Sequence, residues 1–168
     1  MKNRLFLIAC LLILVGSCSK SDENKCIYSN SILTATATEI AYLQNYITTN
    51  ALTATQHSSG IFYTVENPGT GATASVCSNV TVTYTGSLLS NGFVFDSNTS
   101  AAGISFILGQ LIVGWQKGIP LIKSGGRIIL YIPPSLGYGA NTRTDANGNV
   151  IIPANSYLKF TINLLIVQ

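Results

Sequence analysis

Alternation of apolar and hydroxyl-bearing residues governs this chain from Ile61 to its C-terminal end. Val80, Val82 and Tyr84 are separated by threonines, and positions 158, 160, 162 and 164 are all apolar. Successive side chains of a strand point to opposite faces of its sheet, so this period of two predicts strands with one apolar face. Turn sequences such as Asn67-Pro68-Gly69 separate these segments. The chain is therefore expected to be dominated by an antiparallel sheet.

Two short segments have helical spacing instead. Ile40, Leu43 and Ile47 recur on one face of the segment 36–47, and Thr36-x-x-Glu39 has the pattern of a capping box. Residues 111–119 form the only candidate helix inside the strand-rich region. These elements predict an α+β fold, with a curved antiparallel sheet against one short helix and a short N-terminal helical arm.

The N-terminus has the pattern of an export signal. Two basic residues precede the apolar run Leu5–Val15, which is too short to span a bilayer, and Val15-Gly16-Ser17-Cys18 resembles the lipobox of bacterial lipoproteins. We predict a signal peptide over 1–17, a lipidated Cys18, a tether over 18–30, a helical arm and linker over 31–59, and one domain over 60–168. An ordinary signal peptide that happens to contain Cys18 is the alternative.

Charge argues against nucleic acid as a partner. The chain has nine basic and six acidic residues, and loss of Lys2 and Arg4 with the signal would leave seven against six, a net charge of +1. Charged residues make up 9% of the chain, well below the ~25% of average proteins. No cluster of Lys and Arg remains of the kind that binds phosphate backbones.

Two cysteines, Cys26 and Cys77, would remain beside Cys18 in the exported chain. The oxidising compartment permits a disulfide between them, and two unpaired thiols are the alternative. Two cysteines so far apart, with His57 as the only histidine, do not make a persuasive zinc site. We therefore predict no metal site.

From about Gly60 to Val167 the chain carries an ordered set of motifs. They are Val82-x-Tyr84-x-Gly86, Gly92-x-Val94-Phe95-Asp96-Ser97, Phe106-x-Leu108-Gly109, Ile112-x-Gly114-Trp115-x-x-Gly118, Leu136-Gly137-Tyr138-Gly139, Ile151-Ile152-Pro153 and Leu158-x-Phe160. In their order and spacing these motifs resemble the FKBP-type peptidyl-prolyl isomerases. That family folds as a curved antiparallel sheet wrapped around one short helix, which agrees with the pattern above.

The resemblance implies a pocket between helix and sheet, with Trp115 as its floor. The residues it implies as catalytic are Tyr84, Phe95, Asp96, Trp115 and Tyr138. Those it implies as substrate-binding are Phe106, Leu111, Ile112, Ile152 and Phe160. It further implies that the Ile112 N–H and the Tyr138 hydroxyl donate hydrogen bonds to ligand carbonyls, and that Asp96 accepts one from Tyr84.

Three features depart from the family pattern. Residues 97–105 contain no Arg or Lys, whereas many relatives have a basic residue there that supports the aspartate. The loop 140–150 is longer and more polar than in compact relatives. Leu111 stands where valine is common.

The resemblance implies rotation of X–Pro bonds in exported or envelope proteins, with proline-containing polypeptides as clients, macrolide inhibitors as further ligands and no cofactor. A non-catalytic binding module at the cell envelope, and a passive lipid-anchored platform for adhesion, are the alternatives. We expect a monomer in the cell envelope, anchored in the outer membrane on its periplasmic or surface side.

Overall fold

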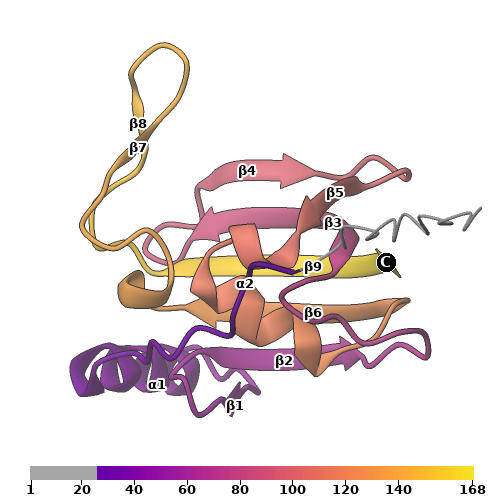
Figure 1. The fold of residues 1–168 in the computed structure, drawn as a ribbon. Coiled ribbons are helices and arrows are strands. Elements are labelled where there is room, and N and C mark those ends of the chain that lie inside the picture. Colours follow the sequence, from indigo (N-terminus) through magenta and orange to yellow (C-terminus); the bar gives the residue numbers. More distant parts are fainter. Residues whose placement is uncertain (1–25) are drawn as a thin grey trace, which may run out of the picture.

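A seven-stranded antiparallel sheet forms the body of the molecule in the computed structural model, which describes residues 26–168 (Figure 1). The sheet order is β1-β2-β6-β9-β3-β4, and β5 also pairs with β3. The predicted α+β class is thus confirmed, while the signal peptide and Cys18 lie outside the described residues. The strands of this sheet are β1 (Thr55–Gln56), β2 (Phe62–Asn67), β3 (Asn79–Leu88), β4 (Val94–Asn98), β5 (Ile104–Ile107), β6 (Gly126–Ile132) and β9 (Leu158–Val167).

One short helix, α2 (Val113–Gly118), lies against a face of this sheet and carries Trp115 into the core. The 3-10 turns η1 (Leu108–Gln110) and η2 (Ile119–Leu121) flank it. A Cβ atom added to Gly114 would lie 2.5 Å from the Ile132 side chain. Glycine at this position therefore lets the helix approach β6 closely, which places Trp115 under the sheet.

The N-terminal helix α1 (Ala37–Thr49) covers part of the opposite face of the sheet. Thr36 is its N-cap, and the predicted capping box with Glu39 is present. Leu43 and Ile47 are buried against Phe62 and Tyr131. Because α1 covers this face while the main core covers the other, the sheet is shielded from solvent on both sides here.

The part of the predicted arm and linker that follows α1 has structure of its own. It contains β1, whose residues pair with Phe62 and Tyr63 of β2. His57 in this segment is half-buried, and its Nδ1 lies 2.9 Å from the hydroxyl of Ser59. A two-residue strand has no detectable period, so the sequence pattern did not reveal it.

Residues 26–30, assigned to the tether, are attached to the domain. Of the two alternatives for Cys26 and Cys77, the structure has the disulfide. Tyr28 covers Gly109, and its hydroxyl accepts a hydrogen bond of 2.7 Å from the Gln110 side chain. The chain is therefore attached to the domain from its first described residue. The polar composition of 18–30 suggested a free tether, but a disulfide to a residue 51 positions away holds its end in place. None of the helices in residues 26–168 is long and apolar enough to cross a membrane.

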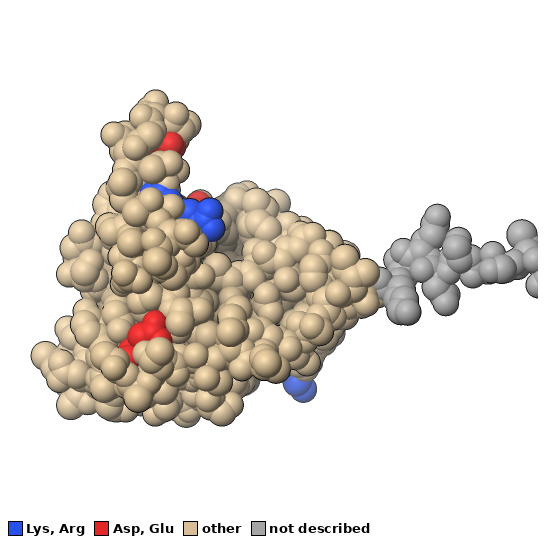
Figure 2. All heavy atoms as spheres, turned by 60° about the vertical axis from the view of Figure 1, so that its left-hand side comes forward, with Lys and Arg blue, Asp and Glu red and all other residues tan. Residues whose placement is uncertain are grey.

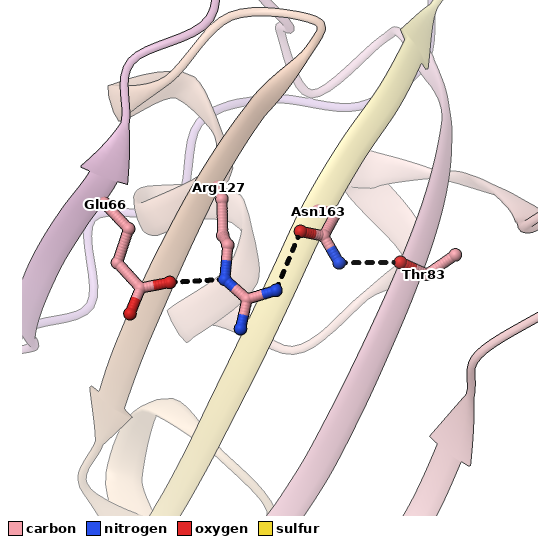
Figure 3. A network of polar contacts seen from close by, with 4 residues as sticks. All are labelled: Glu66, Thr83, Arg127 and Asn163. Atoms are coloured by element: carbon pink, nitrogen blue, oxygen red, sulfur yellow. Dashed lines mark hydrogen bonds and ion pairs between the residues drawn. The ribbon is translucent and has the colours of Figure 1, made fainter.

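A row of polar side chains crosses four strands on the face away from α2 (Figure 3). Glu66 on β2 pairs with Arg127 on β6, which donates a 3.1 Å hydrogen bond to Asn163 on β9. The Asn163 side chain in turn donates a hydrogen bond of 2.8 Å to the hydroxyl of Thr83 on β3. Thr83 directly precedes Tyr84 on β3, and consecutive side chains of a strand point to opposite faces of the sheet. Since Thr83 belongs to this polar row, Tyr84 points to the face that packs against α2.

The long loop 140–150 forms a hairpin that stands out from the body (Figures 1 and 2). Its strands are β7 (Arg143–Thr144) and β8 (Val150–Ile152). Asp145 closes the tip, accepting hydrogen bonds from the backbones of Asn147 and Asn149. The face seen in Figure 2 carries few charged residues, as the composition led us to expect.

Candidate active site

The polar centre of the site is a hydrogen bond between neighbouring strands. The Tyr84 hydroxyl on β3 donates to the Asp96 carboxylate on β4 over 2.6 Å. Burial, and then the bond to Asp96, raise the pKa of Tyr84 far above its usual range, so the hydroxyl stays protonated and able to donate even where a free tyrosine would ionise. Within residues 26–168 no basic side chain pairs with Asp96, in keeping with the absence of Arg and Lys from 97–105.

Three aromatic rings meet the single tryptophan edge to face. The Trp115 ring lies 5.3 Å from the rings of Tyr84 and Phe160 and 6.5 Å from that of Phe106, with interplanar angles of 84–87°. Such T-shaped pairs add about 0.5–1.5 kcal/mol each beyond the area they bury. Trp115 keeps only 4% of its surface exposed. The rings therefore form a rigid apolar floor and wall.

Gly86 permits this arrangement. A Cβ atom there would lie 2.6 Å from the Phe160 ring and 2.8 Å from the Phe95 ring, which are themselves an edge-to-face pair. Gly86 pairs with Asp96 and with Phe160 in the sheet. The two rings close over the backbone of β3 because no side chain separates them.

The opposite wall comes from the turn before α2. Leu111 and Ile112 precede the helix, and Gln116 fixes their backbone by donating to the carbonyl of Leu111 at 2.7 Å and to that of Gly109 at 3.2 Å. No hydrogen bond within residues 26–168 uses the N–H of Ile112. Gln116 was not among the predicted site residues, because nothing in the sequence distinguishes it from a solvent-facing glutamine.

Tyr138 forms the rim, in the turn between β6 and the projecting hairpin. Burial raises the pKa of Tyr138, and the nearby positive charge of Arg143 opposes this rise. The Arg143 guanidinium lies 4.9 Å from the centre of the Tyr138 ring, within range of a cation–π contact. Arg143 is the only basic residue of the loop 140–150, a signal that the sequence offered but that we did not use.

The structure brings the ten predicted pocket residues together in two adjoining cavities. The inner cavity, of about 190 Å³, is lined by Tyr84, Asp96, Phe106, Leu111, Ile112, Trp115, Tyr138 and Phe160. The outer one shares Asp96 and Tyr138 with it and adds Phe95 and Ile152, together with Arg143 and Ile151, which were not predicted. Cys26 and Cys77 lie apart from both cavities, and Cys18 is outside the described residues.

This arrangement suits binding and desolvation. The inner cavity offers five aromatic rings and two aliphatic side chains, with hydroxyl, carboxylate and backbone N–H groups at its edge. An apolar guest with hydrogen-bonding groups on both sides would fit such a surface. None of the residues lining either cavity is a serine, cysteine, lysine or histidine.

Comparison with known proteins identifies the domain. The family model for FKBP-type peptidyl-prolyl cis-trans isomerases matches residues 71–165. The chain is similar to FkpA of Buchnera aphidicola subsp. Schizaphis graminum (42% identical over 113 residues, 66% of this chain and 42% of that protein). It is also similar to FkpA of Escherichia coli K12 (38% identical over 111 residues, 66% of this chain and 39% of that protein). The chain thus spans about two fifths of the length of these curated relatives.

Solved structures agree on the fold. The crystal structure of FkpA from Escherichia coli has a TM-score of 0.64 at 35% identity and covers 79% of this chain and 60% of its own. A peptidyl-prolyl cis-trans isomerase from Pseudomonas syringae has the same TM-score at 26% identity, and the match covers 82% of this chain and 99% of that protein. By its matching family model, its motifs and its fold, this chain belongs to the FKBP-type peptidyl-prolyl cis-trans isomerase family.

Proposed function

We propose that the chain accelerates cis–trans rotation of X–Pro bonds in polypeptides. The observation that carries this proposal is the inner cavity, in which edge-to-face aromatic rings surround a space that two tyrosine hydroxyls also line. Family membership supports the same activity.

The chemistry of the bond explains how such a cavity suffices. Resonance gives the amide C–N bond double-bond character, with a rotational barrier of ~18–20 kcal/mol, and uncatalysed X–Pro exchange takes roughly tens to hundreds of seconds. Twisting removes the resonance, so the transition state has less charge separation than the planar forms. A dry aromatic cavity therefore favours the twisted amide. No proton needs to be transferred.

Rim groups would hold the substrate while its amide turns. The N–H of Ile112, which has no hydrogen-bond partner within residues 26–168, and the hydroxyl of Tyr138 would donate to carbonyls on either side of the proline. Asp96 keeps the Tyr84 ring in place through the 2.6 Å hydrogen bond. Lowering the barrier by about 5–7 kcal/mol would give roughly four to five decades of rate.

The first test is a rate measurement on the exported form of the chain. Exchange of short X–Pro peptides should be faster with the protein than without it, as followed by NMR exchange spectroscopy. Asp96→Leu and Tyr138→Phe should lower kcat/KM about 10-fold or more while the midpoint of urea unfolding changes little, because Tyr138 would contact the substrate and Asp96 positions the Tyr84 ring. Tyr63→Phe, a half-buried tyrosine that lines neither cavity, is the control. Peptide binding without any acceleration would contradict the proposal and favour a non-catalytic binding module.

We further propose that the protein is exported to the cell envelope and anchored by lipid on Cys18. The signal-like residues 1–17 and the Cys26–Cys77 disulfide support this location. Incorporation of labelled palmitate by the native chain, and its loss in Cys18→Ala, is the expected result. A labelled Cys18→Ala chain would contradict it. Proline-containing clients, macrolide inhibitors bound in the inner cavity, and a monomeric state complete the proposal.

A further inference from the structure

The carboxylate of Glu39 joins the N-terminal helix to the turn that leads into the active site. Its Oε2 accepts from the backbone N–H of Thr36 at 2.8 Å and from the hydroxyl of Ser135 at 2.8 Å. Its Oε1 accepts from the backbone N–H of Ser135, also at 2.8 Å. The capping box needs only the bond to Thr36. Both bonds to Ser135 are therefore additional to the capping of α1.

Ser135 lies in the 3-10 turn η3 (Pro134–Leu136), three residues before Tyr138. The Pro134 carbonyl of this turn accepts from the N–H groups of Gly137 and Gly139, each at 2.9 Å. These glycines flank Tyr138 on both sides. A displacement of the turn would therefore move the Tyr138 backbone, and with it the hydroxyl at the rim of the inner cavity.

Glu39 is itself held firmly. One turn of helix further along, Leu43 is fully buried, and the Tyr42 ring stacks on Tyr157 with 4.0 Å between ring centres. Burial alone would raise the pKa of Glu39, but the hydrogen bonds from Thr36 and Ser135 outweigh it and the pKa is lowered. The carboxylate is thus ionised at neutral pH, when its hydrogen bonds are strongest.

We propose that Glu39 is a positioning residue for the isomerase site: its carboxylate fixes the turn Pro134–Leu136 and thereby the hydroxyl of Tyr138. Glu39 lies outside the matched family region 71–165, on an element that lines neither cavity. On this proposal the N-terminal helix contributes to the geometry of the active site. The catalytic consequence rests on the proposed function, whereas the structural link does not.

Two alanine substitutions provide a matched pair. Thr36→Ala and Ser135→Ala each remove one hydroxyl that hydrogen-bonds to the same oxygen, Oε2 of Glu39. The first weakens the helix cap, and the second weakens the link to the turn. We expect Ser135→Ala and Glu39→Ala to lower kcat/KM for X–Pro peptides about threefold to tenfold, with Thr36→Ala close to the native chain.

A double-mutant cycle separates positioning from general loss of structure. If Glu39 acts through the Tyr138 hydroxyl, Glu39→Ala should lower kcat/KM in the native chain but have little further effect in Tyr138→Phe. Additive losses, or native-like kcat/KM in Glu39→Ala, would overturn the proposal.

Hydrogen exchange tests the link without any activity. The amides of Leu136, Gly137 and Gly139 should exchange about tenfold faster in Glu39→Ala than in Thr36→Ala. Equal exchange in the two variants would overturn the proposal. If the native chain proves inactive on every peptide, the proposed function fails, and the exchange rates alone decide whether Glu39 holds the turn.

Discussion

Individual tyrosines determine much of the chemistry of this molecule. Tyr84 and Tyr138 supply the hydroxyls of the inner cavity, and both are half-buried among apolar side chains. Burial raises their pKa values, and also those of Tyr131 and Tyr157 beside α1. These residues are therefore neutral in the folded protein at pH values where an unfolded chain would begin to ionise.

Stability should consequently decline in alkali. A group whose pKa is higher in the folded state than its unfolded value of 10.0 contributes fully below that pH, and its contribution is lost as the pH rises toward the folded pKa. We expect the midpoint of urea unfolding to fall steadily above about pH 10. In Tyr84→Phe the midpoint should fall less steeply with pH, because this variant lacks the tyrosine whose pKa is raised most. Parallel pH curves for the two proteins would contradict this assignment.

The elements differ in how far the sequence could predict them. The cap of α1 was predictable because Thr36 and Glu39 interact locally, and β9 because apolar and polar residues alternate from Leu158 to Leu164. The path of residues 26–30 and strand β1 were not, since contacts distant in sequence determine both. Family motifs located ten pocket residues. They did not locate Gln116 or Arg143, and the capping pattern of Glu39 did not reveal its bonds to Ser135, which lies 96 positions away.

Close approach of α2 to β6 gives a prediction at this scale. Gly114→Ala would gain about 1 kcal/mol of helix propensity, yet it drives a Cβ atom to 2.5 Å from the fully buried Ile132. Overpacking of this kind costs about 1–3 kcal/mol, so we expect a net loss of unfolding free energy in urea. In an Ile132→Ala background the same change should cost little. A more stable Gly114→Ala protein would show that α2 can move away freely.

The disulfide gives a second prediction for an element, the segment before α1. Cys26 and Cys77 are 51 positions apart, so their bond removes many conformations from the unfolded chain. Replacing both by serine should lower the unfolding free energy by about 2–4 kcal/mol. Urea titration with and without a reductant measures it, and the serine variant, which lacks this bond, should not respond to the reductant. An unchanged midpoint would mean that the contacts of Tyr28 alone hold the segment.

At the scale of the whole molecule, the sheet carries apolar residues on both faces. Its main core lies under α2, while Leu89 and Tyr131 pack with Phe62 beneath α1. The matched family region begins at residue 71, so α1, β1 and β2 all precede it, and α1 and β2 contribute to the second hydrophobic cluster. Within residues 26–168, the N-terminal helix and the matched region share side-chain contacts in this cluster.

A chain shortened to begin at Gly60 should reveal this dependence. Phe62 and Tyr131, now 1% and 3% exposed, would face water. We expect stronger binding of a hydrophobic dye and a lower urea midpoint than in the full chain, because uncovered apolar surface is unfavourable and promotes association. Native-like dye binding and stability would show that α1 is dispensable for folding.

The solitary indole at the floor of the inner cavity also makes the protein its own optical probe. With one tryptophan in the chain, emission excited near the red edge of absorption comes from Trp115 alone. Its surroundings are the rings of Tyr84, Phe106 and Phe160 and whatever fills the space above them. Occupancy of the site can therefore be titrated by fluorescence in the native protein, with no attached label and no background from a second emitter.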